Sequence, residues 1–150
     1  MPNTQAFCTS AKVELLNGIH ALGTTVTRGG TGADSWKAAL YLASATVNAS
    51  TTAYSATGEV SGTNYTAGGA TFTWTAPNSS GTTAFSTPSA NIVWTSVTLS
   101  TAFDAVLLYN TTQANRAFSV HTFGSQTVTA GNFSLTMPSN DSTSALIRIA

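Results

Sequence analysis

Hydrophobic and polar residues alternate along much of this chain, and the alternation predicts strands. Residues 71–76 alternate aromatic side chains with threonines, which is the period of a strand with one buried face. Residues 103–109 are almost continuously apolar and too short for a surface helix, so they predict a central strand buried on both faces. Phe118 and Val120 alternate with polar neighbours after a polar turn, so this segment predicts the second strand of a hairpin.

Several other segments also have the pattern of a strand. Residues 92–99 predict a strand with a bulge, because the inward face switches from Trp94 to Val97. A turn is expected at residues 130–132. The further predicted strands are residues 36–43, 84–85, 133–137 and 145–150. Many short strands separated by turn residues favour a mainly β fold, either an antiparallel β-sandwich or a jelly roll.

Residues 9–22 are the stretch with helical periodicity, and they predict one short N-terminal helix. Thr9 or Ser10 can cap its start, and Gly23 is placed to end it. Gly18 opposes the helix, because a glycine inside a helix costs about 1 kcal/mol relative to alanine.

This pattern divides the chain into an N-terminal helical arm, residues 1–23, and a β-sandwich domain, residues 24–150. An apolar helix and a glycine-rich loop outside a complete sandwich have surface left to bury, so we expect an adhesive surface there. Exposed tyrosines also suit interfaces, because they bury a large area at low entropic cost. The expected interface residues are Leu15, Leu16, Ile19, Leu22, Arg28, Tyr54 and Tyr65.

Charge is scarce in this chain. Only 7% of the 150 residues are charged, with five acidic and five basic side chains, against roughly 25% in ordinary soluble domains. A neutral surface rich in hydroxyl groups attracts polyanions weakly, so we expect neither nucleic acid nor membrane as a partner. Such a surface suits close packing into an assembly, and it equally suits an uncharged monomeric β-domain. Cys8 is the only cysteine, which excludes an intramolecular disulfide.

The titratable groups are few and far apart in sequence. His20, His121 and Cys8 belong to no metal-binding motif, and residues 29–32 lack the ending of a phosphate-binding loop. We therefore expect no catalytic site, no cofactor and no metal ion. Trp36, Trp74 and Trp94 each have apolar neighbours at strand spacing, so core packing is the expected role of these residues.

Asp104 and Glu59 are the carboxylates for which we weigh a catalytic role against a structural one. Together they could form the acid pair of a glycosidase. A structural ion pair of Arg116 with Asp104 or Glu59 is favoured instead. Asp104 lies in an apolar strand, where a carboxylate needs a partner, and Arg116 follows across the predicted turn. An enzyme is accordingly the least favoured class.

One set of strand and turn segments extends over most of the chain. It comprises WKAALY at 36–41, Tyr54, TGEVSG at 57–62, YTAGG at 65–69, and residues 103–110, 115–117, 123–124, 129–131 and 137–149. Together these segments resemble small virion structural proteins of tailed bacteriophages. The predicted N-terminal helix lies outside the resemblance, and the matched segments contain packing and turn residues rather than a reactive centre.

The resemblance implies a particle component that is not an enzyme. Small neutral β-domains on a phage head act as decoration or cement proteins, which bind across neighbouring major capsid subunits and often form dimers or trimers. We therefore expect synthesis in the host cytoplasm, a place on the head exterior of the virion, and roughly 800 Å² buried per partner. The alternatives are a tail or fibre component that contacts the host, and a carbohydrate-binding module with an aromatic-lined groove.

Overall fold

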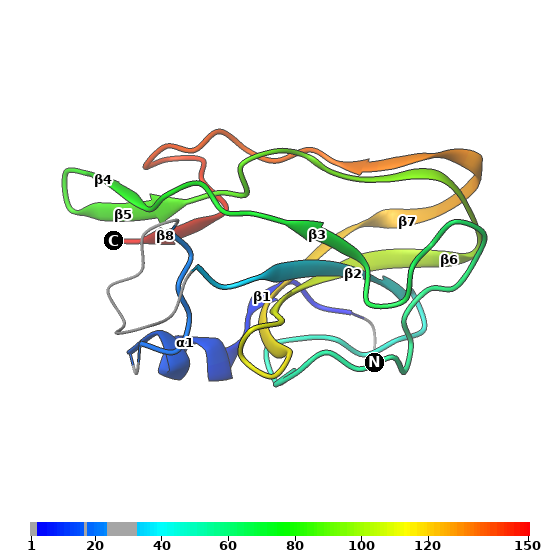
Figure 1. Ribbon diagram of the computed structural model, residues 1–150, viewed down its shortest axis with the longest axis horizontal. Coiled ribbons are helices and arrows are strands. Elements are labelled where there is room, and N and C mark those ends of the chain that lie inside the picture. Colours follow the sequence, from blue (N-terminus) through cyan, green and yellow to red (C-terminus); the bar gives the residue numbers. More distant parts are fainter. Residues whose placement is uncertain (1–2, 17, 24–32) are drawn as a thin grey trace.

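Two antiparallel β-sheets form the body of the protein in the computed structural model, which describes residues 3–16, 18–23 and 33–150 (Figure 1). The larger sheet has the strand order β1-β7-β6-β2-β3, and the smaller has the order β4-β5-β8. The elements are β1 (Ala6–Phe7), α1 (Thr9–Leu16), β2 (Trp36–Leu42), β3 (Ala70–Phe72), β4 (Asn78–Ser80), β5 (Thr83–Ser86), β6 (Ile92–Asn110), β7 (Arg116–Leu135) and β8 (Ile147–Ile149). This arrangement confirms the mainly β, sandwich-like class with one short N-terminal helix.

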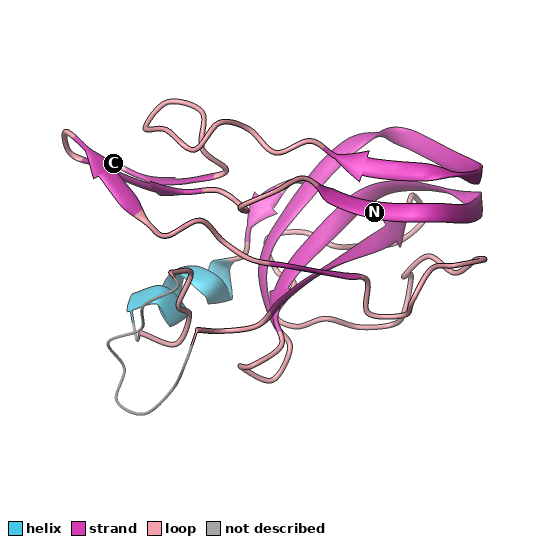
Figure 2. Cartoon of the chain, turned by 45° about the horizontal axis from the view of Figure 1, so that its top comes forward, coloured by secondary structure: helices cyan, strands magenta, loops and turns pink. Residues whose placement is uncertain are grey.

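Strands β6 and β7 form one long hairpin, which bends so that its two halves face each other. Residues 92–99 and 103–109, predicted as separate strands, belong to one strand, and the turn predicted at residues 130–132 lies inside β7. Bulges interrupt the pairing of the two strands, and Ser96 and Ala130 adopt φ angles of 51° and 46°. The hairpin turns back on itself near its middle (Figures 1 and 2).

Aromatic side chains fill the space inside this bent hairpin. The ring centroid of Phe133, from the distal half of the hairpin, lies 4.9 Å from that of Phe103 and 5.3 Å from that of Phe123. The predicted bulge is confirmed, because the register shifts between Trp94 and Val97 and both side chains are buried. The bulges therefore keep apolar residues inward while the hairpin bends.

A second aromatic cluster forms around Phe118 on β7. The Phe118 ring contacts those of Phe7, His20, Trp36 and Trp74, with centroid distances between 4.9 and 5.6 Å. Edge-to-face pairs of this kind stabilise a core beyond the area they bury. The three tryptophans of the chain are each at most 5% exposed, which confirms their predicted place in the core.

Helix α1 is shorter than the predicted helix at residues 9–22. It ends at Leu16, and Gly18, whose φ is 67°, lies just beyond this end; the amide of Gly18 donates to the carbonyl of Leu15, and that of Ile19 donates to the carbonyl of Glu14. These two bonds form a Schellman motif, in which a glycine ends the helix in the left-handed conformation. Gly18 therefore terminates the helix instead of weakening its interior, and Ile19 and Leu22 follow α1.

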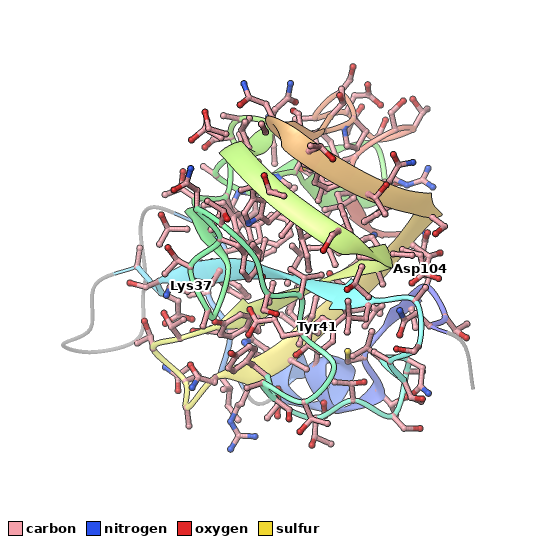
Figure 3. The ribbon with its side chains drawn as sticks, turned by 90° about the vertical axis from the view of Figure 1, so that its right-hand side faces the viewer. Lys37, Tyr41 and Asp104 are labelled. Carbon is pink, nitrogen blue, oxygen red and sulfur yellow. The ribbon has the colours of Figure 1, made fainter. Side chains whose placement is uncertain are left out.

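The N-terminal segment is integrated into the fold and does not form a separate arm. Strand β1 pairs with β7, and Cys8 and Ala11 are completely buried. Asn3 donates hydrogen bonds to the carbonyl oxygen of Leu42 and to Asp104, which is labelled in Figure 3. The expected division into an arm at residues 1–23 and a sandwich at 24–150 is therefore wrong for the described part of this segment.

Candidate functional site

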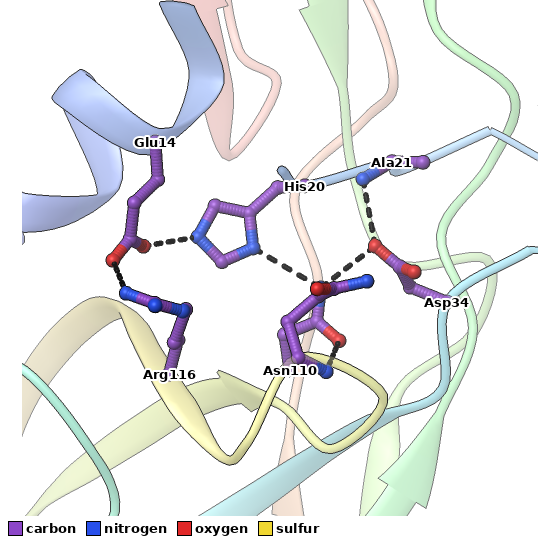
Figure 4. A network of polar contacts seen from close by, with 7 residues as sticks. Glu14, His20, Ala21, Asp34, Asn110 and Arg116 are labelled. Atoms are coloured by element: carbon purple, nitrogen blue, oxygen red, sulfur yellow. Dashed lines mark hydrogen bonds and ion pairs between the residues drawn. The ribbon is translucent and has the colours of Figure 1, made fainter. Parts of the chain in front are cut away.

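A cluster of acidic and basic side chains lies where α1 meets the turn between β6 and β7 (Figure 4). Glu14, from the last turns of α1, forms an ion pair of 2.5 Å with Arg116 at the start of β7. The second carboxylate oxygen of Glu14 lies 2.7 Å from Nε2 of His20. His20 and Asp34 are 6% and 8% exposed, so these two residues are buried, whereas the Arg116 side chain lies at the surface.

Asn110, at the end of β6, connects the two halves of this cluster. Its side-chain nitrogen lies 3.0 Å from Nδ1 of His20 and donates a 2.7 Å bond to Asp34, which also accepts the amide hydrogen of Ala21. The Asn110 side-chain oxygen accepts the amide hydrogen of Gln113. All the hydrogen-bonding atoms of this completely buried amide therefore have partners, as a buried amide requires.

These contacts assign the proton of the imidazole. The Asn110 side-chain nitrogen can only donate, so Nδ1 of His20 accepts and Nε2 carries the proton that it donates to Glu14. Burial lowers the pKa of His20, although the carboxylates of Glu14 and Asp34 act in the opposite direction. Because both ring nitrogens have partners, the neutral imidazole has no free nitrogen to act as a base on a substrate.

The ion pair predicted for Arg116 has a different acid from either one expected. Arg116 pairs with Glu14, and not with Asp104 or Glu59. The strand register explains the difference, because Arg116 lies opposite Asn110 in the hairpin. Asp104 is six residues further along β6, about 20 Å away at roughly 3.3 Å per residue. The prediction of an Arg116 pair with Asp104 or Glu59 is therefore wrong.

Glu59 forms the centre of a separate cluster, which fastens the long loop between β2 and β3. Its carboxylate accepts hydrogen bonds from the hydroxyl of Tyr54 at 2.6 Å, the hydroxyl of Tyr65 at 2.8 Å and the amide of Gly68 at 2.8 Å. The hydroxyl of Tyr109 on β6 donates to the carbonyl of Gly68. A carboxylate with three donors is an anchor for the loop and differs from the free acid that a glycosidase needs.

The tyrosines around Glu59 are held in their neutral form. Burial, and then the nearby Glu59 carboxylate, raise the pKa of Tyr109 to about 12. The same two causes raise the pKa of Tyr54 and of Tyr65 well above the usual range. The rings of Tyr54 and Tyr109 are stacked at 4.8 Å. Tyr54 and Tyr65, expected at an interface, are therefore both engaged within the chain.

The chain approaches β2 most closely at Gly69, in the same loop. A Cβ atom on this residue would lie 1.8 Å from the carbonyl oxygen of Ala38, and its φ is 78°. Only glycine fits both the conformation and the space. Tyr41 of β2, labelled in Figure 3, donates to the carbonyl of Ser55 and fastens the opposite side of the loop. The loop is thus held against β2 by close packing at one side and a hydrogen bond at the other.

An apolar cavity of about 240 Å³ lies next to the His20 cluster. Leu15 and Leu22 line it, together with Phe118 of the aromatic cluster and Ile147 and Ile149 of β8. Ile149 is 58% exposed, so apolar surface continues outside the cavity. Of the expected interface residues, Leu15, Ile19 and Leu22 are half-buried. The side chains of Leu16 and Arg28 lie outside the described residues.

Sequence patterns singled out His20 and Arg116 but predicted neither the other residues of this site nor their grouping. His20 was weighed as a metal ligand, with a solvated or packed histidine favoured instead, while Glu14, Asp34 and Asn110 belonged to no motif. The Asn110 and His20 contact spans 90 residues, and a single sequence carries no local signal for a contact of that range. Among the described residues, no three acidic, cysteine or histidine side chains gather where they could hold a metal ion. Burial raises the pKa of the Cys8 thiol to about 11.

Together, the fold and the two clusters define a β-sandwich-like protein whose buried polar groups fasten its loops. No family model, curated protein or solved structure matches the chain. None of the helices in the described ranges is long and apolar enough to cross a membrane.

Proposed function

We propose that this protein is a structural component of a tailed bacteriophage particle, and that it binds across major capsid subunits as a decoration or cement protein. The observation that carries the proposal is the set of strand and turn segments that resemble phage virion proteins. Gly69 and Glu59 lie in these segments, and both hold the long loop against the larger sheet. These two residues therefore maintain the shape of the protein, which suits a protein that acts through its surface.

The chemistry of the clusters also supports a structural role. Glu14 and Glu59 accept hydrogen bonds from arginine, histidine, tyrosine and backbone groups of the same chain. Buried polar groups that satisfy one another make a fold specific and rigid. A rigid surface with few charges loses little entropy or solvation on binding, which favours attachment to several neighbouring subunits.

The positions of the aromatic residues favour this proposal over a carbohydrate-binding module. Trp36, Trp74 and Trp94 are buried, and the hydroxyls of Tyr54 and Tyr65 are bound to Glu59. A sugar platform requires exposed aromatic faces, which these five side chains do not supply as a group. Copies of the chain itself, as dimers or trimers, and the major capsid protein are the proposed partners.

Cryo-electron microscopy of particles that contain this protein tests the proposal. Density in many symmetric copies between capsid subunits on the head is the expected result. Density confined to the tail would overturn the decoration role in favour of a tail or fibre component. Absence from purified particles, checked by mass spectrometry, would overturn the virion assignment itself. Glycan binding by such a protein in solution would then favour a binding module.

A further inference from the structure

Polar contacts of His20 and Ala21 attach the segment that follows α1 to neighbouring parts of the chain. Within residues 18–23, the imidazole of His20 contacts Glu14 and Asn110, and the amide of Ala21 donates to Asp34. The preceding segment is fastened differently. There β1 pairs with β7, and the amides of Cys8 and Thr9 donate to backbone carbonyls of other elements. The imidazole thus supplies two side-chain contacts to residues 18–23, one with α1 and one with β6.

This imidazole is surrounded by groups that distinguish its protonation states. Glu14 faces Nε2 from α1, and Arg116 of β7 is bound to the other oxygen of Glu14. Asn110 faces Nδ1 from β6, and Asp34, before β2, accepts the second hydrogen of the Asn110 amide. The rings of Trp36 and Phe118 cover the imidazole at 5.7 and 5.3 Å.

A second proton on His20 would break this arrangement at Nδ1. The new N–H would point at the side-chain nitrogen of Asn110, which also donates, so two donors would face each other. Rotating the Asn110 amide to offer its oxygen would remove the donor to Asp34 and would turn the amide oxygen toward that carboxylate. It would also remove the acceptor for the amide of Gln113. No orientation of Asn110 satisfies all these neighbours once His20 is doubly protonated.

The same segment forms one wall of the apolar cavity. Leu22 and His20 line the cavity from this side, and Phe85, Ile147 and Ile149 line it from the smaller sheet. We propose that His20 is a pH-sensitive latch that holds residues 18–23 over this cavity, and that protonation of its Nδ1 releases the segment and exposes the apolar lining. The depressed pKa of His20, caused by burial, is consistent with this device. The latch does not depend on the proposed function.

Hydrogen exchange of the full chain, followed by mass spectrometry between pH 7.5 and 4.5, tests the latch. After correction for intrinsic exchange rates, peptides covering residues 14–23 should open more often as the pH falls below about 6.5. The opening constant should increase by up to roughly tenfold per pH unit, because the released histidine takes up one proton. Peptides from the centre of β6, which open only when the sheet unfolds, should remain far better protected than residues 14–23 throughout this pH range. Opening of residues 14–23 that is independent of pH would overturn the proposal.

Two variants make the test specific. His20→Gln keeps a donor for Glu14 but cannot gain a second proton, so the pH dependence of opening should disappear. His121→Gln is the matched control, because His121 also has a pKa lowered by burial but contacts Ser119 on β7, and residues 14–23 of this variant should retain the wild-type profile. An unchanged profile in His20→Gln would refute the latch.

A measurement on the unmodified protein covers the case in which His20→Gln does not fold. Titration of the His20 ring protons by NMR should give a pKa below the ordinary value of about 6.5. Binding of an apolar fluorescent dye should increase over the pH range in which residues 14–23 open. A ring that titrates at or above its ordinary value would refute the latch.

Discussion

Glu14 and Arg116 are separated by 102 positions in the chain and form an ion pair of 2.5 Å that joins α1 to the start of β7. The two side chains differ in their surroundings, because Glu14 is 8% exposed and Arg116 is 45% exposed. The carboxylate is buried and depends on its partners, whereas the guanidinium is partly hydrated. Removing a partner of the buried carboxylate should therefore lower the free energy of unfolding more than removing an exposed charge elsewhere.

Replacing Arg116 by alanine should destabilise the protein by about 1–3 kcal/mol, because the buried Glu14 carboxylate loses one of its two partners. Urea unfolding at neutral pH measures this difference. Arg148→Ala is the control, because Arg148 is exposed on β8 and its removal should change the unfolding free energy by less than about 0.5 kcal/mol. Equal effects of the two substitutions would show that the Glu14 pair contributes little.

The loop anchor at Glu59 gives a second prediction. Glu59→Gln replaces an acceptor of three hydrogen bonds by an amide that presents two donor hydrogens to Tyr54 or Tyr65. We expect a loss of about 1–3 kcal/mol, which corresponds to a decrease in Tm of several degrees in calorimetry. Tyr54→Phe removes one of the bonds and should cost about 1 kcal/mol. A Tm that is unchanged in Glu59→Gln would contradict the role of this carboxylate as an anchor.

Alanine substitutions at two glycines, compared with each other, measure the free-energy cost of a side chain where the loop approaches β2 closely. Gly69 and Gly18 both have positive φ, so alanine is strained at either position. A Cβ at Gly69 would collide with the carbonyl of Ala38, whereas one at Gly18 would meet no atom within 4 Å. Gly18→Ala should therefore cost about 1–2 kcal/mol, and Gly69→Ala clearly more. Equal unfolding free energies of the two variants would rule out the collision as an important cost.

Local sequence patterns were sufficient to predict the class of fold, but they did not predict how the strands continue and bend into layers. Apolar alternation identified β2 and both halves of the long hairpin, because the period of side chains along a strand is a local property. The same patterns predicted four strands where β6 and β7 each continue through bulges at Ser96 and Ala130. A bulge and a turn use similar residues, so the sequence does not distinguish a bent strand from two strands.

The polar clusters could not be assembled from the sequence for a different reason. Arg116 was expected to pair with Asp104 or Glu59, and its actual pairing with Glu14 depends on how α1 packs against β7. Gly18 shows the same limit on a shorter scale. Its cost in a helix interior was recognised, whereas its role at the end of α1 requires the hydrogen bonds to Leu15 and Glu14.

His121 provides a prediction about pH and stability. Burial lowers the pKa of His121 to about 4, whereas an unfolded chain binds this proton near pH 6.5. The contribution of neutral His121 to the free energy of unfolding is complete above about pH 6.5. It is lost progressively as the pH falls toward 4, because the unfolded state is protonated first. His121→Gln should reduce the decline in urea midpoint between pH 7 and pH 4.5. A decline as steep as that of the wild type would contradict the assignment.

Deletion of residues 1–23 tests whether the N-terminal segment is part of the core. The expectation from the sequence was a folded domain without this segment. The structure predicts a loss of more than about 3 kcal/mol, because the deletion removes the packing of Cys8 and Ala11 and uncovers Phe118. Near-ultraviolet circular dichroism and thermal unfolding measure the effect. The control replaces Thr4 and Gln5, both exposed, by alanine and should leave the midpoint unchanged. A truncated protein with wild-type stability would mean that residues 1–23 are an independent arm.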